Sequence, residues 1–181
     1  MKVYEFLATG FEPIEAIGPV DILRRGDIDT KTVSITGDKL VEASNGTTVK
    51  ADLLIEEADC SDADLLLLPG GMPGATNLNA CMPLRQMLAA HHAKGRRIGA
   101  ICAAPIVLGS LGLLKGRRAT CYPGFEGHLA GAEYTGEMCT VDGNIITGKG
   151  PGATFEYAFT LLAALTGRDK AREVAAAMLC D

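Results

Sequence analysis

The stretch Arg97-Ile98-Gly99-Ala100-Ile101-Cys102-Ala103-Ala104-Pro105 decides the fold, because it reads as a strand that stops on a cysteine and passes at once into a helix. Small side chains, Ala100 and Ala104, stand two positions before and two after the cysteine, as a sharp strand-to-helix turn requires. A sulfur on such a turn lies beside a helix N-terminus, where unpaired N–H groups favour a thiolate. We therefore predict that Cys102 is an ionised nucleophile; the alternative is a small buried hydrophobe.

Short apolar runs alternate with longer helical patterns on both sides of this turn, which is typical of a mostly parallel sheet covered by helices. The all-apolar run Leu65-Leu66-Leu67-Leu68 predicts a central strand buried on both faces. Val141-Asp142-Gly143-Asn144 predicts the turn of one antiparallel hairpin. The expected strands are 2–7, 31–35, 64–68, 97–101, 118–121 and 144–147, and the expected helices are 13–25, 83–94, 105–111, 154–165 and 169–178. Pro19 lies inside the first of these helices and predicts a kink or a break there.

Composition limits the classes of function. A chain of 181 residues that is 48% hydrophobic fits one domain, residues 1–181. Its net charge of -5 makes nucleic acid an unlikely partner. The six cysteines form no CxxC pair and predict free thiols in a reducing, cytoplasmic compartment. We expect neither a membrane span nor secretion, because the N-terminus has no long apolar segment and no later run is long enough.

Backbone N–H groups near Cys102 are the candidates for holding a substrate oxygen. The paired glycines Gly70 and Gly71 follow the Leu65–Leu68 strand, and glycine lets a main chain approach a ligand closely. Because a carbonyl that is attacked becomes negative, we predict the N–H groups of Gly71 and Ala103 as oxyanion donors. A plain strand-to-helix loop is the alternative for the glycine pair.

A carboxylate is the better candidate for proton transfer, since none of the three histidines lies near Cys102 in the sequence. Glu15 falls in the first turn of the helix that begins at Pro13, and Glu12 competes with it for the same role. A glutamate that faces a thiolate in a partly dry pocket keeps its proton to higher pH and can relay it. Two histidines, His91 and His92, are predicted to be exposed on a helix.

Four motifs resemble those of the ThiJ/PfpI (DJ-1-like) superfamily, in matching order over nearly the whole chain. They are Gly10-Phe11-Glu12-Pro13-Ile14-Glu15 with Pro19-Val20-Asp21, Leu68-Pro69-Gly70-Gly71, Ala100-Ile101-Cys102-Ala103-Ala104-Pro105, and Gly148-Lys149-Gly150-Pro151-Gly152-Ala153-Thr154-Phe155-Glu156. The last is similar to the turn before the late helix of the DJ-1-like branch.

The resemblance implies a flavodoxin-like three-layer α/β sandwich that forms a homodimer. It implies Cys102 as the nucleophile and Glu15, rather than Glu12, as its acidic partner, with Tyr122 and Pro151 beside the site. The chain departs from protease-like members, which have a histidine where Ala103 stands, and from DJ-1-like members with a histidine where Tyr122 stands. No histidine follows Gly150, which disfavours an amidotransferase.

With proteases and amidotransferases disfavoured, the resemblance implies a reaction that a cysteine and a glutamate perform together without a metal or cofactor. The expected function is a glyoxalase or deglycase that acts on reactive aldehydes or early glycation adducts. The alternative is a redox sensor or chaperone that works by oxidation of Cys102. A structural protein without a site is the third possibility.

Overall fold

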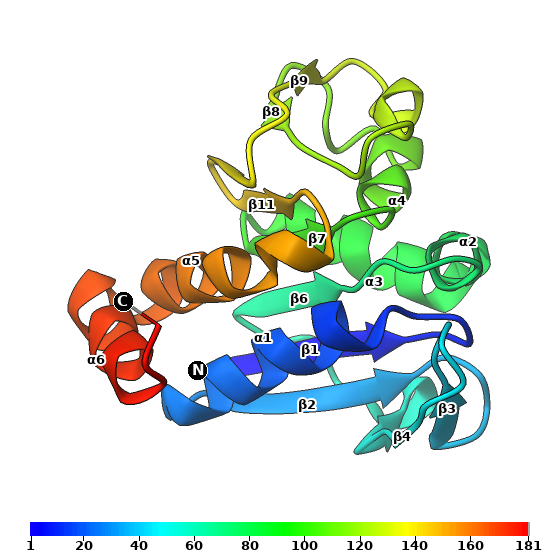
Figure 1. Ribbon diagram of the computed structural model, residues 1–181. Coiled ribbons are helices and arrows are strands. Elements are labelled where there is room, and N and C mark those ends of the chain that lie inside the picture. The colour runs from blue at the N-terminus through cyan, green and yellow to red at the C-terminus, as the bar shows by residue number, and fades with distance from the viewer. Residues whose placement is uncertain (181) are drawn as a thin grey trace.

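The computed structural model describes residues 1–180 and is built on one seven-stranded sheet (Figure 1). Every neighbouring pair of strands is parallel except the pair at one edge, β10–β11. The strands, in spatial order, are β10 (Cys139–Asp142), β11 (Ile145–Gly148), β7 (Arg97–Ile101), β6 (Leu65–Leu68), β1 (Lys2–Leu7), β2 (Asp29–Ser34) and β5 (Leu53–Leu54).

The predicted hairpin and five of the six predicted strands agree with this sheet. β6 is the middle strand, and its four leucines are fully buried, as expected for a strand with helices on both faces. The expected hairpin pairs Asp142 of β10 with Ile145 of β11, and Gly143 takes a positive φ of 59° in the turn. The ends of β2, β6 and β11 differ from the expected ranges by one or two residues.

Helices cover both faces of the sheet, which confirms the predicted three-layer α/β fold. One face carries α1 (Pro13–Arg25), α5 (Thr154–Thr166) and α6 (Arg168–Ala177), whose apolar residues pack on Leu65 and Leu67. The other carries α2 (Gly74–Ala80), α3 (Met82–Ala93) and α4 (Pro105–Ser110), and the buried residues of α3 and α4 pack on Leu66 and Leu68. None of the helices within residues 1–180 is both long and apolar enough to cross a bilayer.

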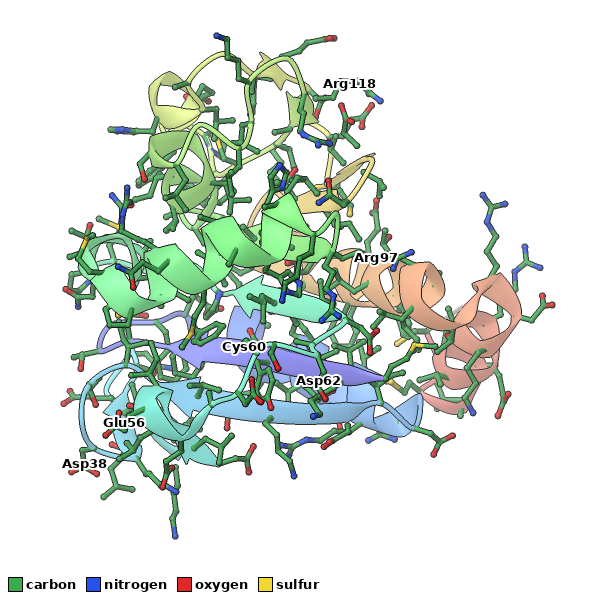
Figure 2. All side chains as sticks on the ribbon, turned by 180° about the vertical axis from the view of Figure 1, so that it is seen from behind. Asp38, Glu56, Cys60, Asp62, Arg97 and Arg118 are labelled. Atoms are coloured by element: carbon green, nitrogen blue, oxygen red, sulfur yellow. The ribbon has the colours of Figure 1, made fainter. Side chains whose placement is uncertain are left out.

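Three sequence expectations need correction. Pro19 does not split the first helix, because α1 runs unbroken from Pro13 to Arg25. His91 is buried rather than exposed, with its ring Nε2 2.9 Å from the Arg97 carbonyl, and His92 is partly buried, 3.3 Å from Asn144 Nδ2. Segment 118–121 does not join the main sheet: β8 (Arg118–Ala119) pairs with β9 (Glu133–Tyr134), and Figure 2 shows Arg118 at the top, away from the central strands.

Several short elements were not expected from the sequence. They are α2, the strand pair β3 (Leu40–Glu42) and β4 (Thr48–Lys50), and the 3-10 turns Ile55–Glu57, Glu126–His128 and Pro151–Ala153. Each is seven residues or shorter, so none of them shows a full period of hydrophobic residues.

Candidate active site

The structure has a sharp turn at Cys102, where β7 ends. Cys102 adopts a φ of 63°, in the left-handed region that a residue with a Cβ occupies only at a cost. Two bonds hold it there: its N–H donates to the Gly148 carbonyl at 2.9 Å, and its carbonyl accepts from the Tyr122 N–H at 2.9 Å. Both flanking small residues, Ala100 and Ala104, are fully buried, so the turn leaves no room for larger side chains.

Glu15 lies in the first turn of α1 and is fully buried. Its Oε2 accepts a hydrogen bond from the Gly70 N–H at 3.0 Å. Burial raises the pKa of Glu15 to about 7, further helped by the Glu12 carboxylate, while the hydrogen bonds to Cys102 and to the Gly70 N–H lower it. Glu12 instead caps the helix, with its Oε2 2.7 Å from the Glu15 N–H, so the structure brings Glu15 and not Glu12 to the cysteine.

Gly70 makes the approach of these two side chains possible. A Cβ at position 70 would lie 2.5 Å from Glu15 Oε2 and 2.6 Å from Cys102 Cβ. Only a residue without a side chain fits between them. The loop after β6 therefore brings Glu15 to Cys102.

The electrostatics of Cys102 differ from the expectation of a thiolate favoured by the helix N-terminus. Burial, and then the nearby Glu15 carboxylate, raises the pKa of the Cys102 thiol to about 12. Hydrogen bonds from the Gly71 and Ala103 N–H groups oppose this rise. These are the two groups predicted as oxyanion donors, and both point at the sulfur. A thiolate here therefore requires that Glu15 carry the proton, because a protonated carboxyl no longer repels the sulfur and can donate to it.

Tyr122 and Pro151 lie close to the turn. Together with Met138, Lys149 and neighbouring backbone they line a hollow of about 260 Å³, next to the Cys102 carbonyl that Tyr122 binds. The Lys149 ammonium donates to the Gly136 carbonyl at 3.0 Å. Lys149 therefore helps to fix the wall of the hollow.

Within residues 1–180, no histidine is among the groups that hydrogen-bond Cys102 or shift the pKa of its thiol. His128 lines a different hollow with Asn79 and Ser110, and its carbonyl packs on Gly109 in α4. Nor does this part of the chain contain a group of three or more His, Cys, Asp or Glu residues arranged to hold a metal ion.

One pair of residues near the site was missed by sequence reasoning. Glu5 on β1 and Tyr157 on α5 are both buried, on the same side of the sheet as Glu15. The signal was present in the sequence, because Glu5 interrupts the otherwise apolar run Val3-Tyr4-Glu5-Phe6-Leu7 of a strand.

Comparisons with known proteins agree with this architecture. The family model described as the DJ-1/PfpI family matches residues 1–164. Protein DJ-1 homolog B of Arabidopsis thaliana is 42% identical over 175 residues, which are 96% of this chain and 40% of that protein. The glutathione-independent glyoxalase DJR-1.2 of Caenorhabditis elegans is 30% identical over 161 residues, 88% of this chain and 85% of that protein.

Solved structures share the whole fold. The structure of oxidized Toxoplasma gondii DJ-1 matches with a TM-score of 0.95 at 36% identity, over 98% of this chain and 97% of that one. The chain spans less than half the length of the Arabidopsis relatives it matches. With one family model over most of its length and DJ-1 relatives at these identities, the chain belongs to the DJ-1/PfpI family.

Proposed function

We propose that this protein is a cofactor-free glyoxalase or deglycase, with Cys102 as nucleophile and Glu15 as proton carrier. The observation that supports it most is the buried contact of a thiol and a carboxyl, with the Gly70 N–H on the carboxyl and the Gly71 and Ala103 N–H groups on the sulfur. The substrate class is a small 2-oxoaldehyde such as methylglyoxal, or an early glycation adduct of one. The family includes a protein named a glyoxalase.

The reaction begins with proton transfer from the Cys102 thiol to the Glu15 carboxylate. The thiolate then adds to the aldehyde carbon, which forms the C–S bond and leaves an alkoxide. Gly71 and Ala103 N–H groups stabilise that oxygen, and Glu15 returns its proton to it. The product of this half is a neutral hemithioacetal beside an ionised Glu15.

The second half moves a hydrogen from one carbon to the next. Glu15 removes the proton from the carbon that bears sulfur, and the electron pair shifts to give an enediolate. Glu15 then protonates the neighbouring carbon, and the hydroxyl proton of the sulfur-bearing carbon passes to the neighbouring oxygen, which yields the thioester of a 2-hydroxy acid. Water hydrolyses the thioester, releases a 2-hydroxy acid such as lactate and regenerates the thiol, so no external oxidant or reductant is required.

Methylglyoxal turnover by purified variants tests this proposal. We expect Cys102→Ser and Glu15→Gln each to lower kcat/KM by at least about a hundredfold, since each removes a group that acts in the chemical steps. Cys121→Ser is the matched control, because Cys121 is also buried and its thiol pKa is also raised, to about 11. Equal turnover by wild type, Cys102→Ser and Glu15→Gln would contradict the proposal.

A redox sensor is the second candidate, supported by the N–H groups directed at the sulfur and by the relative solved in oxidized form. Peroxide would oxidise the thiol to a sulfinate, which these donors stabilise. Selective addition of two oxygens at Cys102, detected by mass spectrometry, together with negligible methylglyoxal turnover would favour this function. Oxidation spread over all six cysteines would disfavour it.

We further propose that the protein works as a homodimer in the cytoplasm. DJ-1/PfpI proteins are commonly dimers. Apolar side chains of Ile14 and Ile17 on α1 and of Phe155 on α5 are 54%, 39% and 50% exposed, on helices that pack against each other. A reducing compartment suits the unpaired thiols on which the chemistry depends.

A further inference from the structure

Within residues 1–180, four buried side-chain polar atoms on one side of the sheet have no hydrogen-bond partner. They are Glu5 Oε2, Glu15 Oε1, Thr154 Oγ1 and Tyr157 OH, all in side chains that are at most 1% exposed. A buried polar group left unpaired destabilises the fold, and folded proteins satisfy nearly all such groups with protein partners or internal water. Four such atoms in the layer between the sheet and helices α1 and α5 indicate that these side chains share one hydrogen-bond network.

The strand register and the helix packing bring these groups together. Glu5 on β1 stands beside Leu67 on β6, and Leu67 stands beside Gly99 on β7, so these positions form one row that faces α1 and α5. The Tyr157 hydroxyl reaches this row over Gly99, where a Cβ would collide with it. Thr154 lies one turn earlier on α5, and its Cγ2 would be 2.7 Å from a Cβ at Gly18 of α1. The two helices lie side by side over the sheet (Figure 1).

Charge assigns different roles to the two carboxyls. Glu5 Oε2 is buried without a donor in the described part of the chain, whereas Glu15 accepts a hydrogen bond from the Gly70 N–H, so a single negative charge on the two carboxyls is favoured on Glu15. Burial, and then the proximity of Glu15, also raises the pKa of Glu5 well above its ordinary value. Burial and then Glu5 also raise the pKa of Tyr157. A neutral carboxyl both donates and accepts, whereas an ionised one only accepts. Glu5 is therefore a donor, and Glu15 Oε1 is an acceptor without a partner.

The other groups that face this pair are already engaged. Thr32, next to Glu5 on β2, bonds Asp52 Oδ2 at 3.0 Å, and Arg24 of α1 binds the same oxygen. Around Glu15, the Gly70 N–H binds Oε2, the Cys102 thiol also hydrogen-bonds the carboxyl, and the Glu12 carboxylate offers no hydrogen.

Tyr157 is also faced from β10 by Cys139, whose thiol hydrogen-bonds the Thr160 side chain and lies near the Glu156 and Glu137 carboxylates. Cys139 therefore already has a partner of its own. The Glu5 carboxyl and the hydroxyl groups of Tyr157 and Thr154 remain as buried groups without a partner among residues 1–180.

We propose that neutral Glu5 is a positioning residue of the candidate site: it donates a hydrogen bond to Glu15 Oε1, through a small side-chain rotation or one internal water. Tyr157 donates to the second Glu5 oxygen and so fixes the direction of the Glu5 hydrogen. The role assigned to Glu5 rests on the proposed function, because Glu15 is the proton carrier there. Its physical effect is specific, since a donor stabilises the ionised form of Glu15 and offsets part of the penalty from burial.

Carbon-13 NMR titration of glutamate carboxyl carbons tests this arrangement directly. In the wild type the Glu5 signal, identified by its loss in Glu5→Gln, should stay in the protonated position over the whole pH range in which Glu15 titrates. Glu5→Leu removes the donor and should raise the Glu15 midpoint by at least about one pH unit, a tenfold change in proton binding. Tyr157→Phe should shift it in the same direction by less.

Glu5→Gln is the conservative control, because its amide N–H still donates, and the Glu15 midpoint should return to within a few tenths of a unit of wild type. A midpoint that is the same in wild type and Glu5→Leu, or a Glu5 signal that titrates before Glu15, would overturn the inference. Thermal melting of each variant separates misfolding from a specific shift of the Glu15 midpoint. In Glu5→Gln and Tyr157→Phe the new side chain has nearly the same shape as the native one. The titration uses no substrate. Its result therefore tests the role of Glu5 even if the protein does not turn over methylglyoxal.

Discussion

Glu15 and Cys102 are far apart in the sequence, and they meet because Gly70 leaves space between them. Neither residue would be reactive alone: a buried carboxyl holds its proton, and a buried thiol does too. Together with three backbone N–H groups they form a buried pair, and in the proposed function one negative charge moves between its oxygen and its sulfur. The pair, rather than the cysteine, is the chemical unit.

Replacing Glu15 with glutamine should stabilise the protein in a pH-dependent manner. The pKa of Glu15 is about 7 in the folded chain against an ordinary 4.5, so its contribution to stability is fully present below pH 4.5 and is lost as pH rises through 7. Above that pH, Glu15→Gln should unfold with a free energy higher by up to about 3 kcal/mol. Urea denaturation of both proteins from acidic to mildly alkaline pH measures the gap, and a gap that does not change with pH would refute the assignment.

Gly70→Ala should damage the site more than the fold. The added methyl group would overlap Glu15 and Cys102, which we expect to cost about 1–3 kcal/mol and to change the rate at which iodoacetamide labels Cys102. Gly127→Ala is the matched control, because a Cβ there has no neighbour within 4 Å and the backbone is not in the left-handed region. Similar stability and labelling in the two variants would argue against a tight contact at Gly70.

Among the elements, β6 contributes most to the core, since its alternate leucines pack on both helical layers. Leu66→Ala should lower the free energy of unfolding by about 2–5 kcal/mol, as expected for a cavity in a close-packed core. Leu40→Ala on the exposed strand β3 removes the same atoms and should change it by less than about 1 kcal/mol. Chemical denaturation compares the two, and equal losses would contradict the central position of β6.

The elements that the sequence predicted well are those with a strong local pattern. The run of leucines in β6 and the prolines that begin α1 and α4 are such patterns, and these elements lie where expected. The small sheet of β8 and β9 depends instead on pairing between segments about fifteen residues apart, which no local period reveals. In the site, the turn at Cys102 was visible in the sequence, but the raised pKa of its thiol depends on burial, a property of the assembled fold.

At the scale of the whole molecule, the exposed apolar residues Ile14, Ile17 and Phe155 lead to a prediction about assembly. If α1 and α5 form a dimer surface, Ile17→Glu should place a charge in it and convert the dimer to monomer, with at least a tenfold higher dissociation constant. Analytical ultracentrifugation measures this. Leu40→Glu, at an exposed leucine on β3, should leave the mass unchanged, and a monomeric wild type would exclude the dimer.

The two main-chain bonds at Cys102 have a consequence for signalling. Gly148 and Tyr122 secure the peptide groups on either side of this residue, and neither bond involves the sulfur. Alkylation or oxidation of this buried side chain would therefore alter its immediate surroundings while these two main-chain bonds remain. A partner that distinguishes the modified protein from the unmodified one would therefore have to bind close to Cys102. Segments far from Cys102 would keep the same conformation in both forms.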